Sequence, residues 1–218
     1  NGKPIYSLDA APTRAQAVTM LVRLLGRENE ARSGSWSVPF TDLPDWAKPY
    51  VGYAYANGLT NSLGADRFGS GSKVTASQYL TFILRALGYS SESDFQWNNA
   101  AAFSDGLGLT HGEYGAARAF TRGDTARISF AALAQTCKVG DETLAAQLVR
   151  LGAIDEKTAA AFGLASQADG EGFLNIAGSC YTLQNSGGKY LAAAGDALTL
   201  SDKPFVWYAA PAASGSFT

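Results

Sequence analysis

Hydrophobic and polar residues follow a helical period in two matching segments of the chain. Segment 12–26 reads PTRAQAVTMLVRLLG, and segment 74–88 reads VTASQYLTFILRALG. Their apolar residues recur at the steps that line one face of an α-helix. At one constant offset, the corresponding positions are Thr13, Val18, Leu21, Val22, Leu25 and Gly26 in the first copy and Thr75, Leu80, Ile83, Leu84, Leu87 and Gly88 in the second. The pattern predicts two amphipathic helices with buried apolar faces.

Both segments also carry start and stop signals. Thr13 with Gln16, and Thr75 with Gln78, match the capping box that satisfies free amides at a helix start. The closing glycines are typical of helix ends in the left-handed conformation.

A third, weaker copy begins FTRGDTARISFAAL at residue 120. Thr121 and Asp124 are expected to cap it. Ala126, Phe130 and Leu133 are expected to continue the apolar stripe, with Ser129 interrupting it.

Another type of helix precedes the second and third copies. In PDWAKPYVGYAYANGLT, Asp45 can cap the helix and Pro49 falls in its first turn. The face expected to be shared comprises Trp46, Tyr50, Tyr53 and Ala54. DFQWNNAAAFSDGLGLT repeats the pattern around Trp97. Each repeat is therefore predicted to be a helix pair, and the first repeat lacks its tryptophan helix.

The succession FTDLPDWAKPYVGYAYANGLTNSLGADRF, followed by VTASQYLTFILRALG, resembles the S-layer homology (SLH) repeat. That family combines an F-x-D entry, a WA-type helix with a G-[ILV] step, a loop and an I-T-R-A-E helix start. The resemblance spans about residues 1–164, is strong in the middle repeat and is loose in the third. The alternative is a generic helical repeat. DETLAAQLVRLGAIDEKTAAAFGL predicts two short closing helices.

The resemblance implies a mainly α fold, a pseudo-threefold helical bundle with a small β-strand tail. The expected divisions are a partial first repeat at 1–34, a second repeat at 35–92, a third repeat with closing helices at 93–164, and a β-rich segment at 165–218.

SLH repeats anchor secreted bacterial proteins to cell-wall polysaccharide, commonly pyruvylated polymers, in grooves between repeats. The resemblance therefore implies a cell-wall glycan partner and a secreted, cell-surface location. The family's binding arginine, second in T-R-A-E, corresponds to Arg14 and Arg122 here, but to Ala76 in the middle copy. An arginine at this position can bind a carboxylate together with the free amides and the positive dipole end of the helix start. We expect unequal grooves, with the one led by Ala76 the weakest. For each arginine, a solvated side chain is the alternative.

Trp46 and Trp97 match the family's WA tryptophans. Each is either an exposed platform for a sugar or a packed core residue. Asp42 is expected to brace its loop, and Trp36 and Trp207 are expected to pack.

After residue 165, glycine turns separate short runs typical of strands. YTLQNSGGKYLAAA resembles the opening of a ricin-type β-trefoil repeat, of which one and a fraction are present. Either a truncated lectin-like domain or a hairpin packed on the bundle explains this, and truncation is favoured. The chain also opens within a repeat, which favours a mature or truncated form.

The composition of the chain argues against several classes of binding partner. The 218 residues include 17 basic and 19 acidic side chains, a net charge of −2 that argues against nucleic acid. No apolar run is long enough for membrane insertion. Cys137 and Cys180 lack zinc-site spacing, so no metal or cofactor is expected. They are either two thiols or a disulfide.

Two other functions remain alternatives. One is a structural subunit of a surface lattice or filament that self-associates through the bundle. The other is an enzyme, for which His111 and the nearby Glu113 are the only pointer. No nucleophile or phosphate-loop pattern accompanies them, so we expect no enzyme and no catalytic residues.

Overall fold

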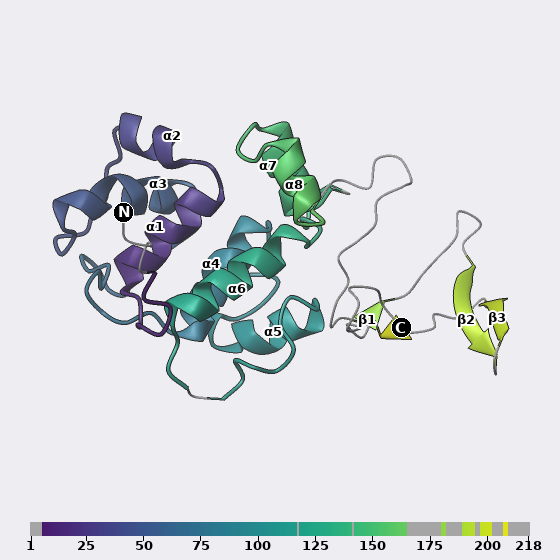
Figure 1. Cartoon of the computed structure of the whole chain (residues 1–218). Coiled ribbons are helices and arrows are strands. Elements are labelled where there is room, and N and C mark those ends of the chain that lie inside the picture. The colour runs from purple at the N-terminus through teal and green to yellow at the C-terminus, as the bar shows by residue number, and fades with distance from the viewer. Residues whose placement is uncertain are drawn as a thin grey trace. The chain divides into compact units, whose positions relative to one another are not determined.

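The structure is a computed structural model, and it describes residues 6–116, 118–140 and 142–164 with the strand segments 180–181, 189–194, 197–201 and 207–208. The chain divides into two compact units, Asn1–Ala168 and Asp169–Thr218. Helices make up the described part of the first unit and short strands that of the second, which confirms the mainly α fold with a small strand tail (Figure 1). The divisions between repeats stay a prediction. None of the described helices is long and apolar enough to cross a membrane.

Three helices that contact one another form the centre of the first unit (Figure 1). They are α1 (Arg14–Leu24), α4 (Ala76–Ala86) and α6 (Arg122–Leu133). Each follows a threonine that makes reciprocal hydrogen bonds with the third helical residue, which confirms all three predicted capping boxes. The pairs are Thr13 with Gln16, Thr75 with Gln78, and Thr121 with Asp124.

The apolar faces of α1 and α4 are buried as their spacing predicts. The fully enclosed side chains are Val18, Leu21, Val22, Leu80, Ile83 and Leu84, joined by Leu87. Leu25, at the C-terminal cap of α1, is only half-buried. Gly26 follows with φ of 66°, and a side chain there would collide with Ala153. The glycine is therefore needed both for the left-handed stop and for a close chain contact.

The expected stripe of α6 is wrong. Ala126 is exposed and Phe130 is 50% exposed, so that only Leu133 of the predicted set is buried. The buried face follows four-residue steps along Asp124, Ile128 and Ala132. Asp124 on this buried face forms ion pairs with Arg118 and Arg127, and Phe130 faces outward.

Short helix segments carry the two tryptophans. A 3-10 turn, η1 (Asp45–Ala47), leads into α3 (Lys48–Ala56), and η2 (Trp97–Asn99) leads into α5 (Ala100–Gly106). The expected cap at Asp45 is wrong, because Pro44 occupies the cap position and Asp45 lies inside the turn. Its carboxylate instead accepts a hydrogen bond from Lys48 Nζ at 2.6 Å. Pro49 lies in the first turn of α3, as predicted.

The remaining helices are α2 (Glu28–Ser33), α7 (Leu144–Arg150) and α8 (Glu156–Ala161). The last two are the predicted closing helices, and α7 contacts α6. Asp42 braces a loop, as expected, because its carboxylate accepts hydrogen bonds from the amides of residues 68–70. Trp36 is half-buried and donates to the Ala31 carbonyl at 2.7 Å, consistent with a packing role.

In the second unit, β2 (Tyr190–Ala194) and β3 (Ala197–Ser201) form an antiparallel pair. A second antiparallel pair joins β1 (Cys180–Tyr181) to β4 (Trp207–Tyr208). The rest of the expected trefoil repeat and the side chains of Cys180 and Trp207 lie outside the described residues. Cys137 is a buried free thiol.

Candidate functional site: two related grooves

One groove of about 390 Å³ lies against α1 and α4, and we call it the Arg14 groove. It brings together two residues singled out in the sequence, Arg14 from the first repeat and Trp97 from the third. The lining residues are Arg14, Asn61, Ser62, Leu63, Gln78, Thr81, Phe82, Arg85, Ser91 and Trp97.

Arg14 is buried rather than solvated, with 4% of its surface exposed. Its guanidinium donates to the Asn61 carbonyl at 2.8 Å and to Thr60 Oγ1 at 3.3 Å. The rings of Phe68 and Phe82 lie 4.8 and 4.9 Å from it. Aromatic faces and neutral oxygens therefore hold the charge in place without neutralising it.

The Arg14 guanidinium is not fully satisfied. Its Nε is buried and has no hydrogen-bond partner, and no carboxylate among the described residues forms an ion pair with it. Burial, assisted by the positive charge of Arg85, lowers the pKa of Arg14 to about 10. The side chain remains protonated at neutral pH, so a dehydrated positive charge lines the groove.

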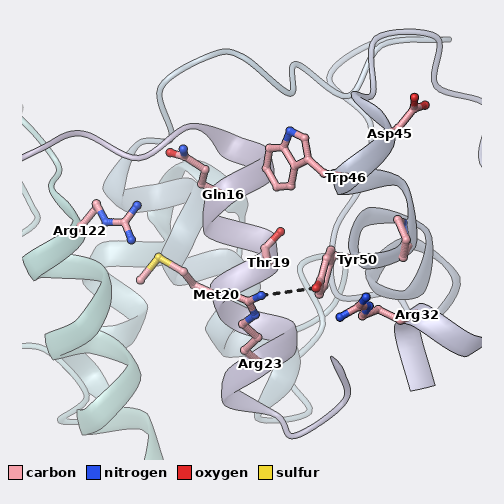
Figure 2. A pocket seen from close by; sticks show the side chains of 10 residues that line it. Gln16, Thr19, Met20, Arg23, Arg32, Asp45, Trp46, Tyr50 and Arg122 are labelled. Carbon is pink, nitrogen blue, oxygen red and sulfur yellow. Dashed lines mark hydrogen bonds between the residues drawn. The ribbon is translucent and has the colours of Figure 1, made fainter. Parts of the chain in front are cut away.

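The second groove, of about 620 Å³, lies on the corresponding face of α1, and we call it the Arg122 groove. Figure 2 shows Arg122 reaching toward α1 from α6, with Trp46 and Tyr50 on the other side of that face. The lining residues are Gln16, Thr19, Met20, Arg23, Arg32, Asp45, Trp46, Pro49, Tyr50 and Arg122.

The two grooves are copies of one arrangement. The floor residues Gln16, Thr19, Met20 and Arg23 of α1 correspond, at the offset of the sequence repeat, to Gln78, Thr81, Phe82 and Arg85 of α4. In each groove, one central helix forms the floor and another central helix supplies the arginine of the T-R motif. The next 3-10 turn after the floor helix in the chain supplies the tryptophan. The four predicted residues thus sort into two pairs, Arg122 with Trp46 and Arg14 with Trp97.

Both tryptophans are exposed. Trp46 is 52% exposed and Trp97 is 65% exposed, so neither is packed in the core. An indole with a free face beside an arginine can stack against the C–H surface of a sugar while the guanidinium binds an acidic substituent. The geometry therefore favours the platform alternative for both residues.

The sequence reasoning missed Arg23 and Arg85. They occupy the same position in LVRLLG and ILRALG, and their retention in both copies was the available signal. Arg23 donates to Glu28 Oε1 at 2.9 Å and to the Tyr50 hydroxyl at 3.5 Å, the contact drawn in Figure 2. Arg85 donates to Ser91 Oγ at 2.6 Å.

The third face of the bundle, on α6, is built differently. Asp124 stands where the other two helices have glutamine, and it is buried between Arg118 and Arg127. Although burial favours the neutral acid, hydrogen bonds from Arg118, Thr121 and Arg127 hold the pKa of Asp124 well below its usual range. These arginines are therefore neutralised internally, unlike Arg14.

The described residues contain no cluster of three histidine, cysteine or acidic side chains that could hold a metal ion. His111 lies outside both grooves, and its backbone amide donates to Glu113 Oε2 at 2.6 Å.

Three relatives are proteins of the bacterial surface. The chain is 37% identical over 114 residues to a "Cell surface protein" of Thermoanaerobacter kivui. It is 31% identical over 101 residues to a "Middle cell wall protein" of Brevibacillus brevis, and 29% identical over 101 residues to a "Surface layer protein" of Brevibacillus choshinensis. These relatives confirm the expected secreted, cell-surface location.

The matches cover 51%, 45% and 45% of this chain, but only 15%, 10% and 9% of the respective relatives. The chain thus corresponds to a small part of each relative. No family model matches it, and neither the SLH assignment nor the trefoil resemblance of the tail gains support from that comparison.

Proposed function

We propose that the first unit of this chain is an SLH-type anchoring module that binds an acidic cell-wall glycan without covalent chemistry. The observation that carries the proposal is Arg14, a buried and unneutralised guanidinium that lines a groove beside the exposed indole of Trp97. Burying a charge without a counter-ion is costly, and an acidic ligand would repay that cost.

The names of the relatives agree with such a role. One is named a cell wall protein and another a surface layer protein. The polar groups in the grooves are mainly guanidinium, amide and hydroxyl groups, which suit recognition of a sugar and its carboxylate. We infer a binding role rather than a catalytic one.

Sedimentation with purified wall sacculi tests the proposal. The chain should pellet with intact sacculi and remain in the supernatant after mild acid has removed pyruvyl ketals. Binding should weaken as salt rises, because screening reduces attraction between charges. Equal binding to treated and untreated sacculi would refute recognition of the acidic substituent, and no binding to either would refute anchoring.

A second candidate is a subunit of a surface lattice or filament. It is favoured by the name of the Brevibacillus choshinensis relative and by an exposed aromatic pair, Phe130 at 50% and Phe162 at 58%. Their ring centroids lie 6.2 Å apart. Light scattering after size-exclusion chromatography, with Phe130→Ser as the variant, tests whether this pair mediates self-association.

A further inference from the structure

The two grooves differ in the partner of their floor arginine. In the Arg122 groove, Arg23 donates to the carboxylate of Glu28, which also accepts a hydrogen bond from the Tyr50 hydroxyl at 2.6 Å. In the Arg14 groove, Arg85 donates to the neutral hydroxyl of Ser91. The counterpart of Tyr50 in that repeat is Ala101, which has no hydroxyl.

This difference changes the charge each groove offers to a ligand. Arg32 and Arg122 also line the Arg122 groove and form no ion pair among the described residues, but both are more exposed than the buried Arg14, so water already solvates their charges. Arg23 and Glu28 form an ion pair with 2.9 Å between Nη2 and Oε1, and this hydrogen bond raises the pKa of Arg23. Burial lowers the pKa of Arg85, an effect that the neighbouring negative charge of Glu92 only partly opposes. No described carboxylate lies within ion-pair distance of either Arg14 or Arg85.

We propose that Glu28 is a built-in counter-ion that occupies Arg23, so that the acidic group of the glycan binds in the Arg14 groove, between Arg14 and Arg85. The ligand class is a sugar carrying a carboxylate or phosphate, with its ring on Trp97. Ser91 and Glu28 then determine which groove selects for charge. This inference rests on the proposed anchoring function and adds a difference in specificity between the two grooves.

The tryptophans provide a separate signal for each groove. The chain has four tryptophans, and their indole N–H resonances can be assigned by substitution. Trp97 reports on the Arg14 groove and Trp46 on the Arg122 groove. Three probes are titrated into the whole chain: a methyl hexoside bearing a 4,6-pyruvyl ketal, the same hexoside without the ketal, and inorganic phosphate.

In the parent, the pyruvylated hexoside should shift the Trp97 signal at concentrations at least about tenfold lower than the Trp46 signal, because a charge-assisted hydrogen bond carries that preference. The unmodified hexoside should show no such preference. A phosphate response at Trp97 supports a general anion site, and a response to the ketal alone supports a carboxylate site. Equal responses of both tryptophans to the pyruvylated hexoside, or none at Trp97, would overturn the proposal.

Exchanging the partner residues tests the cause. Ser91→Glu should weaken the Trp97 response about tenfold or more relative to Ser91→Gln, which has the same size without the charge. Glu28→Gln should strengthen the Trp46 response, whereas Glu30→Gln, which only releases Arg27 at the surface, should leave it unchanged. If Ser91→Glu and Ser91→Gln bind alike while both melt like the parent, the counter-ion idea is wrong.

Sacculus binding separates this inference from the proposed function. If the parent pellets with sacculi and the variants show no groove preference, the anchoring function stands and the charge selection by Glu28 and Ser91 is refuted. If the parent does not pellet, the anchoring function itself fails.

Discussion

Arg14 begins α1, yet it lines the groove on the neighbouring helix α4, beside Trp97. Arg122 of α6 likewise serves the groove on α1. Each T-R arginine therefore acts across a helix interface. Loss of the arginine at Ala76 leaves the α4 groove intact, and its consequence falls on α6 instead.

Because Arg14 is buried without a counter-ion, replacing it should affect ligand binding more than stability. We expect Arg14→Met to lower the affinity for sacculi about tenfold or more, since a charge-assisted contact is lost. Its free energy of unfolding should stay within about 1 kcal/mol of the parent, because removing an unpaired buried charge offsets the lost hydrogen bonds to Thr60 and Asn61. Sedimentation and urea denaturation measure the two effects.

Arg150→Met is the matched charge control, because Arg150 pairs with Glu142 on the surface and lines neither groove. It should bind sacculi like the parent. If the Arg150 and Arg14 variants lose the same affinity, net charge and not the groove accounts for binding.

The effect of replacing a tryptophan should depend on how exposed its side chain is. Trp97→Ala and Trp46→Ala should each reduce the free energy of unfolding by less than about 1 kcal/mol, as surface substitutions do. Each should weaken glycan binding, because the stacking face is removed. Trp36→Ala should instead cost about 3 kcal/mol of stability, since Trp36 packs edge-on to Tyr53 at 5.3 Å. Thermal melts and sedimentation of the three variants decide this, and a large melting-point loss for Trp97→Ala would contradict the platform role.

The sequence predicted those parts of the fold that local signals determine. The capping threonines and the buried faces of α1 and α4 follow from short-range spacing, and both are confirmed. The buried face of α6 was mispredicted because it includes a charged residue, Asp124, which is buried in ion pairs with Arg118 before the helix and Arg127 within it. A count of apolar positions within the helix contains no information about them.

The sequence predicted which residues line the site, but not which arginine shares a groove with which tryptophan. The motif pointed to Arg14, Arg122, Trp46 and Trp97, and all four line grooves. The pairing of Arg14 with Trp97 depends on how three helices pack, and the burial of Arg14 depends on Phe68, which a distant loop supplies. These are long-range consequences that one helix sequence does not encode by itself.

Asp124 should make the fold sensitive to acid. Its pKa in the folded chain lies well below the ordinary value of about 3.9, so at low pH the unfolded chain binds a proton there that the folded chain does not. The stabilisation is fully present above that ordinary value and is lost as pH falls through it toward the folded value. Urea midpoints from pH 6 to pH 3 should therefore fall less in Asp124→Asn than in the parent.

The same variant should lose about 1.5 kcal/mol at pH 6, because the buried carboxylate loses its charge-assisted hydrogen bonds from Arg118 and Arg127, whose own guanidinium groups remain partly solvated. Asp155→Asn, at the exposed cap of α8, serves as a control for a carboxylate outside this cluster and should cost less than about 0.5 kcal/mol, because asparagine caps a helix about as well as aspartate. Parallel pH profiles for Asp124→Asn and the parent would show that this carboxylate does not cause the acid sensitivity.

Restoring the arginine missing at Ala76 should not create a third binding groove. By the repeat relation, Ala76 of α4 corresponds to the residue that would serve α6. That face holds Asp124, which is already shared by two arginines, and the helices that follow α6 among the described residues, α7 and α8, contain no tryptophan. An added arginine would find neither an indole platform nor an unoccupied floor. We therefore expect Ala76→Arg to bind sacculi with the affinity and stoichiometry of the parent, measured by sedimentation over a range of protein concentrations. Asp45→Asn, in the Arg122 groove, and Glu30→Gln, outside both grooves, are each added to Ala76→Arg as controls. If Ala76→Arg increases the number of bound chains per mass of sacculi, and the two added substitutions reduce that increase equally little, the α6 face can bind glycan after all.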